Sequence, residues 1–120
     1  MKIIDTKTHG YMDYIVGIFF IACPSFFNLE HETPQGIIFY AAGAAALIYS
    51  LLTQYELGFI KIIPIRIHLL LDLFSGLILA ASPWLFNFAQ AVYVPHLAFG
   101  LIEIAVAFLT QRQTAQEINA

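Results

Sequence analysis

The sequence predicts an all-α fold in which four transmembrane helices form a bundle. Composition is the first reason, because 60% of the 120 residues are hydrophobic and only 11% are charged. Soluble domains average about 45–50% apolar and about 25% charged residues, so the expected solvent is a lipid bilayer. An internal repeat is the second reason, since residues 2–28 and 61–87 share ten identities at an offset of 59 without a gap. The chain is therefore predicted to be one membrane domain, residues 1–120, built from two tandem copies of a two-helix unit.

The first repeat is expected to cover about residues 2–55, with helices at about 6–28 and 34–55. Thr33 and Pro34 suit the cap and the first turn of the second of these helices. The first apolar run is interpreted as a retained span rather than a signal peptide, because Asp13 interrupts it and the same pattern recurs inside the chain. A helix of about 22 residues is roughly 33 Å long, which is enough to cross a bilayer core of about 30 Å.

The second repeat is expected to cover about residues 61–112, with helices at about 64–87 and 92–112. Pro64 suits the first turn of a helix. The second helices of the two repeats match at an offset of 57, where Leu-Thr-Gln at 52–54 corresponds to Leu-Thr-Gln at 109–111. The polar tail that follows is expected to fray.

The basic residues predict the orientation in the membrane. With four spans, all of them fall on one side: Lys2, Lys7, Lys61, Arg66 and Arg112. The positive-inside tendency therefore predicts cytoplasmic N- and C-termini in a multi-pass protein of the bacterial cytoplasmic membrane. Because each repeat has two spans, the repeats are parallel, and their pseudo-two-fold axis is expected along the membrane normal.

Ionisable residues inside the predicted spans mark a candidate site. His9 and Asp13 lie on one helical stripe, and the second repeat places His68 and Asp72 on the equivalent stripe. If both stripes face the interior, the two His-x-x-x-Asp pairs meet there. Glu103 lies at a similar depth in the last predicted helix and completes the candidate intramembrane polar cluster. His31 and His96 are expected to be less important, in a solvated loop and at the membrane interface.

Three interpretations of this cluster remain open. The side chains can be structural, bonding to one another or to Tyr and Ser hydroxyls of neighbouring helices. They can handle protons or cations, because an ionisable group at such depth is costly unless it is paired, neutral or next to a wet cavity. They can also bind a metal ion or haem, although no tightly spaced ligand motif accompanies them. The sequence assigns no catalytic residue, no metal ligand and no cofactor, and without a nucleophile elbow, phosphate loop or triad an enzyme is not the favoured class.

A short motif in the first helix of the second repeat links the chain to a known family. Ser82-Pro83-Trp84 resembles the signature of the SPW-repeat family of small bacterial integral membrane proteins, whose two-helix repeat carries this triplet in its first helix. The first repeat keeps only Pro24, within Cys23-Pro24-Ser25. The resemblance implies the paired-repeat membrane fold and supplies no catalytic residues.

The expected function is a small structural or assembly module of the membrane, with a transporter-like or channel-like protein for protons or cations as the alternative. Beyond the lipid bilayer, the alanine-rich stretch at 41–46 predicts close helix contacts and a homo-oligomer, with a dimer favoured. Another membrane protein is a further candidate partner. A net charge of −3 gives no reason to expect nucleic acid binding.

Overall fold

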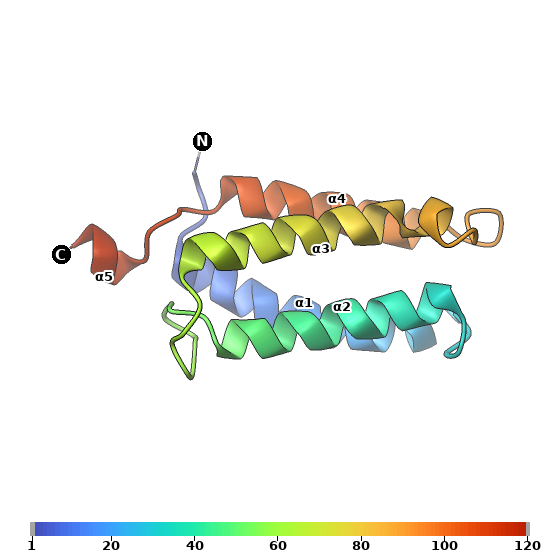
Figure 1. Cartoon of the computed structure of the whole chain (residues 1–120), viewed down its shortest axis with the longest axis horizontal. Coiled ribbons are helices and arrows are strands. Elements are labelled where there is room, and N and C mark those ends of the chain that lie inside the picture. Colours follow the sequence, from blue (N-terminus) through green and yellow to red (C-terminus); the bar gives the residue numbers. More distant parts are fainter. Residues whose placement is uncertain (1, 120) are drawn as a thin grey trace.

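The computed structural model describes residues 2–119, and these residues form an all-α structure with five helices and no strand. Four of the helices are long and run along a body 50 Å in length (Figure 1). The helices are α1 (Thr6–Phe26), α2 (Pro34–Leu51), α3 (Ile65–Leu85), α4 (Val94–Leu109) and α5 (Ala115–Ile118).

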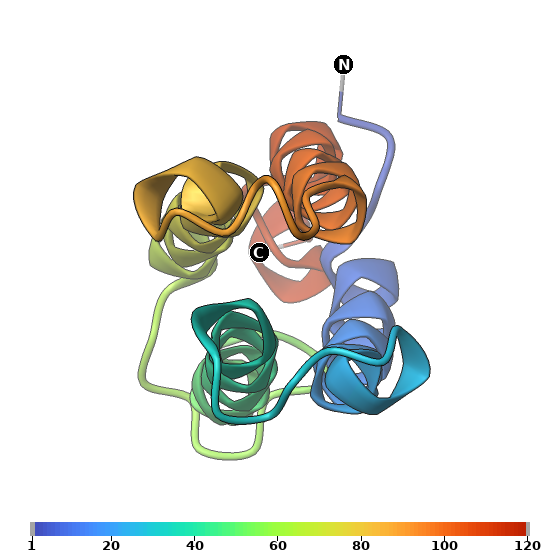
Figure 2. The same cartoon turned by 90° about the vertical axis from the view of Figure 1, so that its right-hand side faces the viewer.

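The long helices pack as two pairs, α1 with α2 and α3 with α4, and α2 also contacts α3. Figure 2, which looks along the helices, shows the four in a four-sided arrangement. Both chain ends and the 52–64 connection lie at one end of the molecule, whereas the 27–33 and 86–93 connections lie at the other (Figure 1). The segments that carry the basic residues therefore gather at the end that holds both termini.

Two glycine pairs allow a close approach within each helix pair. A Cβ on Gly43 would lie 2.7 Å from the carbonyl oxygen of Gly17, and a Cβ on Gly100 would lie 2.6 Å from that of Gly76. Small residues at such contacts let helices pack backbone to backbone. The two pairs occupy corresponding positions in the two halves of the sequence, since Gly17 matches Gly76 and Gly43 matches Gly100.

An asparagine lies two residues beyond the end of the first helix of each half. Asn28 and Asn87 adopt the left-handed conformation, with φ of 58° and 61°. Asparagine tolerates this conformation, which stops a helix just beyond its last turn. α1 and α3 therefore end at Phe26 and Leu85, two residues before the predicted limits of 28 and 87.

The second helix of each half is shorter than the sequence predicted, because an extended segment follows it. Thr53 forms a parallel bridge with Ile63, and Thr110 forms one with Ile4. Extended residues cannot continue a helix. α2 therefore stops at residue 51 rather than near 55, and α4 stops at 109 rather than near 112.

The C-terminal tail, which the sequence predicted to fray, contains a short capped helix. Thr114 and Glu117 form a capping box, in which each side chain bonds to the other residue's backbone N–H, and one turn of helix, α5, follows. The backbone N–H of Ala115 also donates to Glu56 Oε2 at 3.2 Å, which ties the tail to the 52–64 connection.

The interior divides into an apolar and a polar half. The apolar core lies away from the termini and contains Phe20, Cys23, Phe39, Ala42 and Leu79. Cys23 is fully buried there and fills a small space between larger side chains. The nearer turns of α1 and α3 instead bury histidine and aspartate, and this arrangement positions the candidate site.

The outer surface is apolar. Two helices, α2 and α3, are long and apolar enough to cross a membrane, and α4 is apolar but has only 16 residues. Large side chains such as Ile15, Phe74 and Leu101 expose 67%, 57% and 53% of their surface. Exposed apolar surface of this extent is unusual in a soluble protein and indicates contact with lipid.

Candidate functional site

Two histidines and two aspartates converge between α1 and α3. His9 and Asp13 lie one turn apart on α1, and His68 and Asp72 lie one turn apart on α3. His9 Nε2 is 3.0 Å from Asp13 Oδ1 and 2.7 Å from Asp72 Oδ2. His68 Nε2 is 2.9 Å from Asp13 Oδ2 and 3.2 Å from Asp72 Oδ2. Each imidazole therefore lies between the carboxylates of both helices, and we call these four residues the His/Asp cluster.

The His/Asp cluster is almost completely enclosed. His9 and His68 expose 1% and 0% of their surface, and Asp72 exposes 4%. The two imidazole rings contact edge to face, with centroids 5.3 Å apart. Nε2 of His68 makes no well-aligned hydrogen bond within the described residues, although carboxylate oxygens lie close to it. The structure thus brings the two predicted His-x-x-x-Asp pairs together in the interior.

Two threonines bind the other nitrogen of each imidazole. Thr110 Oγ1 is 2.8 Å from His9 Nδ1, and Thr53 Oγ1 is 2.7 Å from His68 Nδ1. Each threonine follows the last turn of its helix and donates its hydroxyl proton to the carbonyl oxygen four residues earlier, at 2.7 Å and 2.6 Å. These threonines were not predicted as site residues, although their match between the two halves of the sequence was the available signal.

Two tyrosines bind the carboxylates from the side of α2. Tyr49 donates its phenol proton to Asp72 Oδ1, and Tyr55 donates to Asp13 Oδ2 at 2.7 Å. Burial and the nearby Asp13 carboxylate raise the pKa of the Tyr55 phenol, so that it stays protonated and remains a donor. Neither tyrosine has a tyrosine counterpart in the other repeat, and only the general expectation of Tyr or Ser partners pointed to them.

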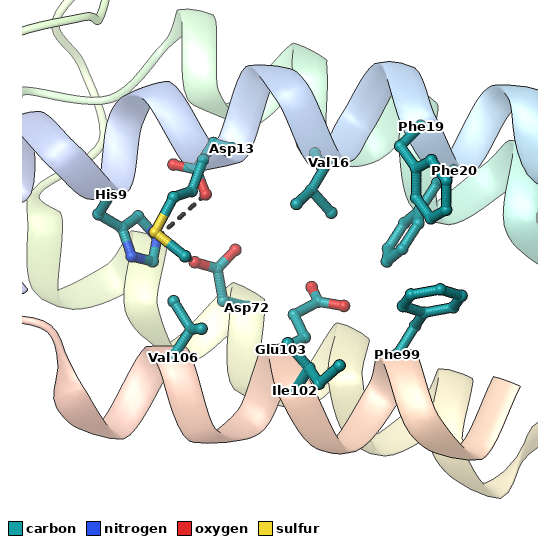
Figure 3. A pocket seen from close by; sticks show the side chains of 12 residues that line it. His9, Asp13, Val16, Phe19, Phe20, Asp72, Phe99, Ile102, Glu103 and Val106 are labelled. Atoms are coloured by element: carbon teal, nitrogen blue, oxygen red, sulfur yellow. Dashed lines mark hydrogen bonds and ion pairs between the residues drawn. The ribbon is translucent and has the colours of Figure 1, made fainter. Parts of the chain in front are cut away.

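Glu103 lies beside the His/Asp cluster rather than within it. A cavity of about 180 Å³ is lined mainly by residues of α1 and α4, together with Ala46 of α2 and Asp72 of α3, and Glu103 is one of its lining residues. Figure 3 shows the Glu103 side chain projecting from α4 into this space, with Asp72 on one side and Phe99 on the other. The Glu103 Oε2 atom is buried and has no hydrogen-bond partner within the described residues. The cavity wall is otherwise mainly apolar, with Phe19 and Phe20 farther from the cluster (Figure 3).

A second, polar cavity lies at the end of the molecule that holds the termini. Its volume is about 480 Å³, and it is bounded by residues 54–61 of the 52–64 connection and by the 114–117 segment. Tyr55 lines this cavity, and the Tyr55 hydroxyl reaches Asp13. Along the helix axis, the His/Asp cluster therefore lies between the two cavities.

The Ser-Pro-Trp residues are remote from the His/Asp cluster, at the opposite end of α3. Ser82 Oγ donates to the carbonyl oxygen of Leu79 at 2.7 Å, and Pro83 is buried near the helix end, as Pro24 is in α1. Trp84 is half exposed and packs on Tyr93, with ring centroids 5.8 Å apart. These contacts explain the motif as a helix-end feature.

The two remaining histidines have different environments. His31 is exposed in the 27–33 connection and bonds to the Tyr40 hydroxyl, which agrees with a loop position. His96 lies in the first turn of α4 and is fully buried. Its Nε2 donates to the Gln35 carbonyl oxygen at 2.9 Å, and its ring packs on Phe39. Neither histidine contacts the His/Asp cluster.

A comparison with family models decides the affiliation, because the model of the SPW repeat domain matches residues 7–110. The chain belongs to the SPW-repeat family. No curated protein and no solved structure gives a significant match. In this SPW-repeat protein the matched range contains the His/Asp cluster and both threonines, whereas the 114–117 segment lies outside it.

Proposed function

We propose that this SPW-repeat protein handles protons or cations within the membrane, as a transporter-like or channel-like module that uses the His/Asp cluster and Glu103. The position of the cluster between two cavities is the observation that carries the proposal. Ionisable groups inside membrane spans are costly, and they mark ion pathways when they adjoin space that water can occupy. The cavity between α1 and α4 reaches the cluster from one side, and Tyr55 connects the second cavity to Asp13 from the other.

The proposed architecture is a four-span bundle of two tandem repeats. Equivalent contacts in the two halves support the duplication, because the Ile4–Thr110 bridge corresponds to the Ile63–Thr53 bridge under the sequence offsets. The contacts between threonine and histidine correspond in the same way. A pseudo-two-fold axis along the membrane normal then relates the two halves.

The proposed location is the bacterial cytoplasmic membrane, with both termini in the cytoplasm. The support is the gathering of the basic segments at the end that holds the termini. In this orientation the polar cavity near Tyr55 opens toward the cytoplasm, and the cavity beside Glu103 lies deeper in the membrane.

Self-association is a further part of the proposal. Ala42 and Ala46 are buried inside the molecule, so they stabilise the packing of α2 on its neighbours. Ala41, Ala44 and Ala45 remain exposed and leave a small-residue surface on which a second copy can pack. Light scattering in detergent decides between a monomer and the proposed dimer.

A structural role is the second candidate function, and the tyrosine contacts favour it. Hydrogen bonds from Tyr49 and Tyr55 join α2 and the following connection to the aspartates of α3 and α1. Such hydrogen bonds also hold helices together in membrane proteins that transport nothing. They do not, however, explain why one cavity is lined by His9, Asp13 and Asp72 while a second is lined by Tyr55, the hydrogen-bond partner of Asp13.

Melting curves of the wild type, Asp13→Asn and Asp72→Asn from pH 5 to 8, with and without a chelator, test the proposed function. We expect the wild-type melting temperature to change with pH or with added cation, and each asparagine variant to lose that response because the charge is missing. In the structural alternative, asparagine keeps a hydrogen-bonding group of similar shape and stability stays equal or rises. A wild type indifferent to pH, chelator and cations would contradict the proposed function.

A further inference from the structure

The donor atoms of the His/Asp cluster are arranged as a metal-binding set. One ligand atom from each of the four side chains lies within 4.8 Å of the others. A tetrahedral ion with bonds of about 2.0–2.1 Å separates its ligand atoms by about 3.3 Å. The shortest separations between imidazole nitrogen and carboxylate oxygen in the cluster run from 2.7 to 3.2 Å. These separations are slightly shorter than tetrahedral spacing, and the others in the set do not exceed 4.8 Å, so a tetrahedral site requires a modest rearrangement of the four side chains.

The two threonines determine which imidazole nitrogen faces the centre. Each threonine hydroxyl has one proton, and that proton is donated to a helix carbonyl oxygen. The threonine oxygen can therefore only accept from the histidine Nδ1, which must carry a proton. Nε2 of a neutral His9 or His68 is then left with a free lone pair directed at the centre. Histidines that bind metals are held in one tautomer by the same kind of outer hydrogen bond.

The tyrosines orient the carboxylates in a similar way, because each binds a carboxylate oxygen. Asp72 accepts the Tyr49 proton at Oδ1, which leaves Oδ2 facing both imidazoles. Asp13 accepts the Tyr55 proton at Oδ2 and faces His9 with Oδ1. All four side chains thus have an outer hydrogen-bond partner that fixes their orientation and an inner atom that is available to a shared occupant.

The centre of the cluster requires positive charge. Two carboxylates and two free imidazole nitrogens that face one another in a dry interior repel unless protons or a cation lie between them. Two protons or one divalent cation satisfy this requirement equally, because either leaves the cluster and its occupant with no net charge. The buried His68 Nε2, which lacks an aligned hydrogen bond within the described residues, favours an occupant other than the four side chains themselves.

We infer that His9, His68, Asp13 and Asp72 bind a divalent transition-metal ion of the zinc class. Two imidazole nitrogens and two carboxylate oxygens suit Zn²⁺, Co²⁺ or Fe²⁺, whereas Mg²⁺ and Ca²⁺ prefer shells made only of oxygen. This inference rests on the proposed cation-handling function and adds the class of ion. The cavity that holds Glu103 is lined by three of these residues, His9, Asp13 and Asp72, and offers a path by which the ion or its displaced protons can leave.

Cobalt titration of the full chain in detergent, after chelator treatment and dialysis, tests the inference. We expect one Co²⁺ per chain, with visible absorption bands of the intensity typical of tetrahedral coordination, and displacement of Co²⁺ by Zn²⁺. His68→Gln and Asp72→Asn should abolish the bands. His31→Gln is the matched control, because His31 is exposed in a connection and lies outside the cluster, and it should leave the titration unchanged.

Two variants of Thr53 test the inference even if a variant of a ligand residue fails to fold. Thr53→Val keeps the side-chain shape but removes the hydroxyl that positions His68, and it should weaken Co²⁺ binding about 10–100-fold. Thr53→Ser restores the hydroxyl and should restore the affinity. Equal affinity in both threonine variants, or bands that persist in His68→Gln, would overturn the assignment of the ligands.

The outcomes also separate this inference from the proposed function. If Co²⁺ and Zn²⁺ do not bind but pH or another cation still shifts the wild-type melting temperature, the metal assignment fails and the proposed function stands. If Ca²⁺ or Mg²⁺ binds as tightly as Zn²⁺, the transition-metal class is wrong. If neither protons nor any cation changes the wild type, both proposals fail together.

Discussion

At the residue scale, four hydroxyl groups determine the geometry of the His/Asp cluster. Thr53 and Thr110 orient the imidazoles, while Tyr49 and Tyr55 orient the carboxylates. The ionisable residues could be predicted from their recurrence in both repeats. The tyrosines could not, because their positions depend on how α2 and the following connection pack on α1 and α3.

Replacing Tyr55 by Phe tests the carboxylate contacts. The variant leaves Asp13 with one donor fewer in a largely buried site, so the free energy of unfolding should fall by about 1–3 kcal/mol. Chemical denaturation in detergent micelles measures the loss. Tyr11→Phe is the control, because Tyr11 is exposed on the same helix as Asp13. Equal stability of the Tyr55→Phe variant and the wild type would show that this hydrogen bond contributes nothing.

Glu56 provides a pH-dependent contact outside the four long helices. Partial burial disfavours its charged form, but hydrogen bonds from Thr6 Oγ1 and from the Ala115 N–H outweigh this effect and lower the pKa of the carboxyl below its ordinary value. A lowered pKa means that the contribution to stability is fully present above the unfolded-state pKa and is lost as pH falls through the folded-state pKa. Asp5, Lys61 and Glu117 are the nearby charged groups.

Glu56→Gln should therefore lower the free energy of unfolding by about 1 kcal/mol at pH 7 and by less at acidic pH, where the wild-type carboxylate is itself protonated. Denaturation curves at pH 7 and near pH 3 measure the difference. Glu32→Gln, at an exposed loop position, serves as the control for loss of a charge. A difference that grows toward low pH would contradict the assigned direction of the pKa shift.

At the element scale, glycine contacts and extended segments set how the helices pack and where they end. The helix starts could be predicted from proline and cap residues, and each observed start lies within about two residues of the prediction. The ends of α2 and α4 could not, because they depend on the bridges that Thr53 and Thr110 form with distant residues. The capping box at Thr114 was visible in the sequence, but the docking of Ala115 on Glu56 was not.

Gly100→Ala tests the close approach of α3 and α4. The added methyl group would meet the Gly76 carbonyl oxygen at 2.6 Å and the Ala80 nitrogen at 2.5 Å, so the helices must separate. We expect a loss of about 1–3 kcal/mol in the free energy of unfolding, as for overpacking elsewhere. Ala105→Val adds bulk on the exposed face of the same helix and should be nearly neutral. A neutral Gly100→Ala variant would mean that the two helices are not held at this distance.

At the scale of the whole molecule, the apolar surface and the uneven distribution of basic residues are the basis of the proposed membrane topology. Composition alone predicted the extensive apolar surface, because so few charged residues are available to cover it. The cavity between α1 and α4 could not be predicted, because it depends on how closely neighbouring helices approach. The backbones of α2 and α3 lie close together, whereas α1 and α4 meet mainly through side chains such as Phe19 and Phe99. A sequence repeat alone would suggest equal contacts on both sides.

A reporter fusion tests the proposed orientation. A fusion after Ala120 should be active only with a reporter that works in the cytoplasm, because all five basic residues lie in segments at the end that holds the termini. Insertion of the same reporter in the 27–33 connection should give the opposite result. Periplasmic activity of the C-terminal fusion would reverse the orientation and, with it, the side to which the Tyr55 cavity opens.

The most direct test of the central claim is a flux measurement in vesicles. The claim is that the His/Asp cluster carries protons or cations, so vesicles that contain the wild type should dissipate an imposed pH or Zn²⁺ gradient faster than protein-free vesicles. Vesicles with the Asp13→Asn and Asp72→Asn double variant, reconstituted to the same density, should show only the protein-free rate. Equal rates for the wild type, the double variant and protein-free vesicles, for both gradients, would contradict the account.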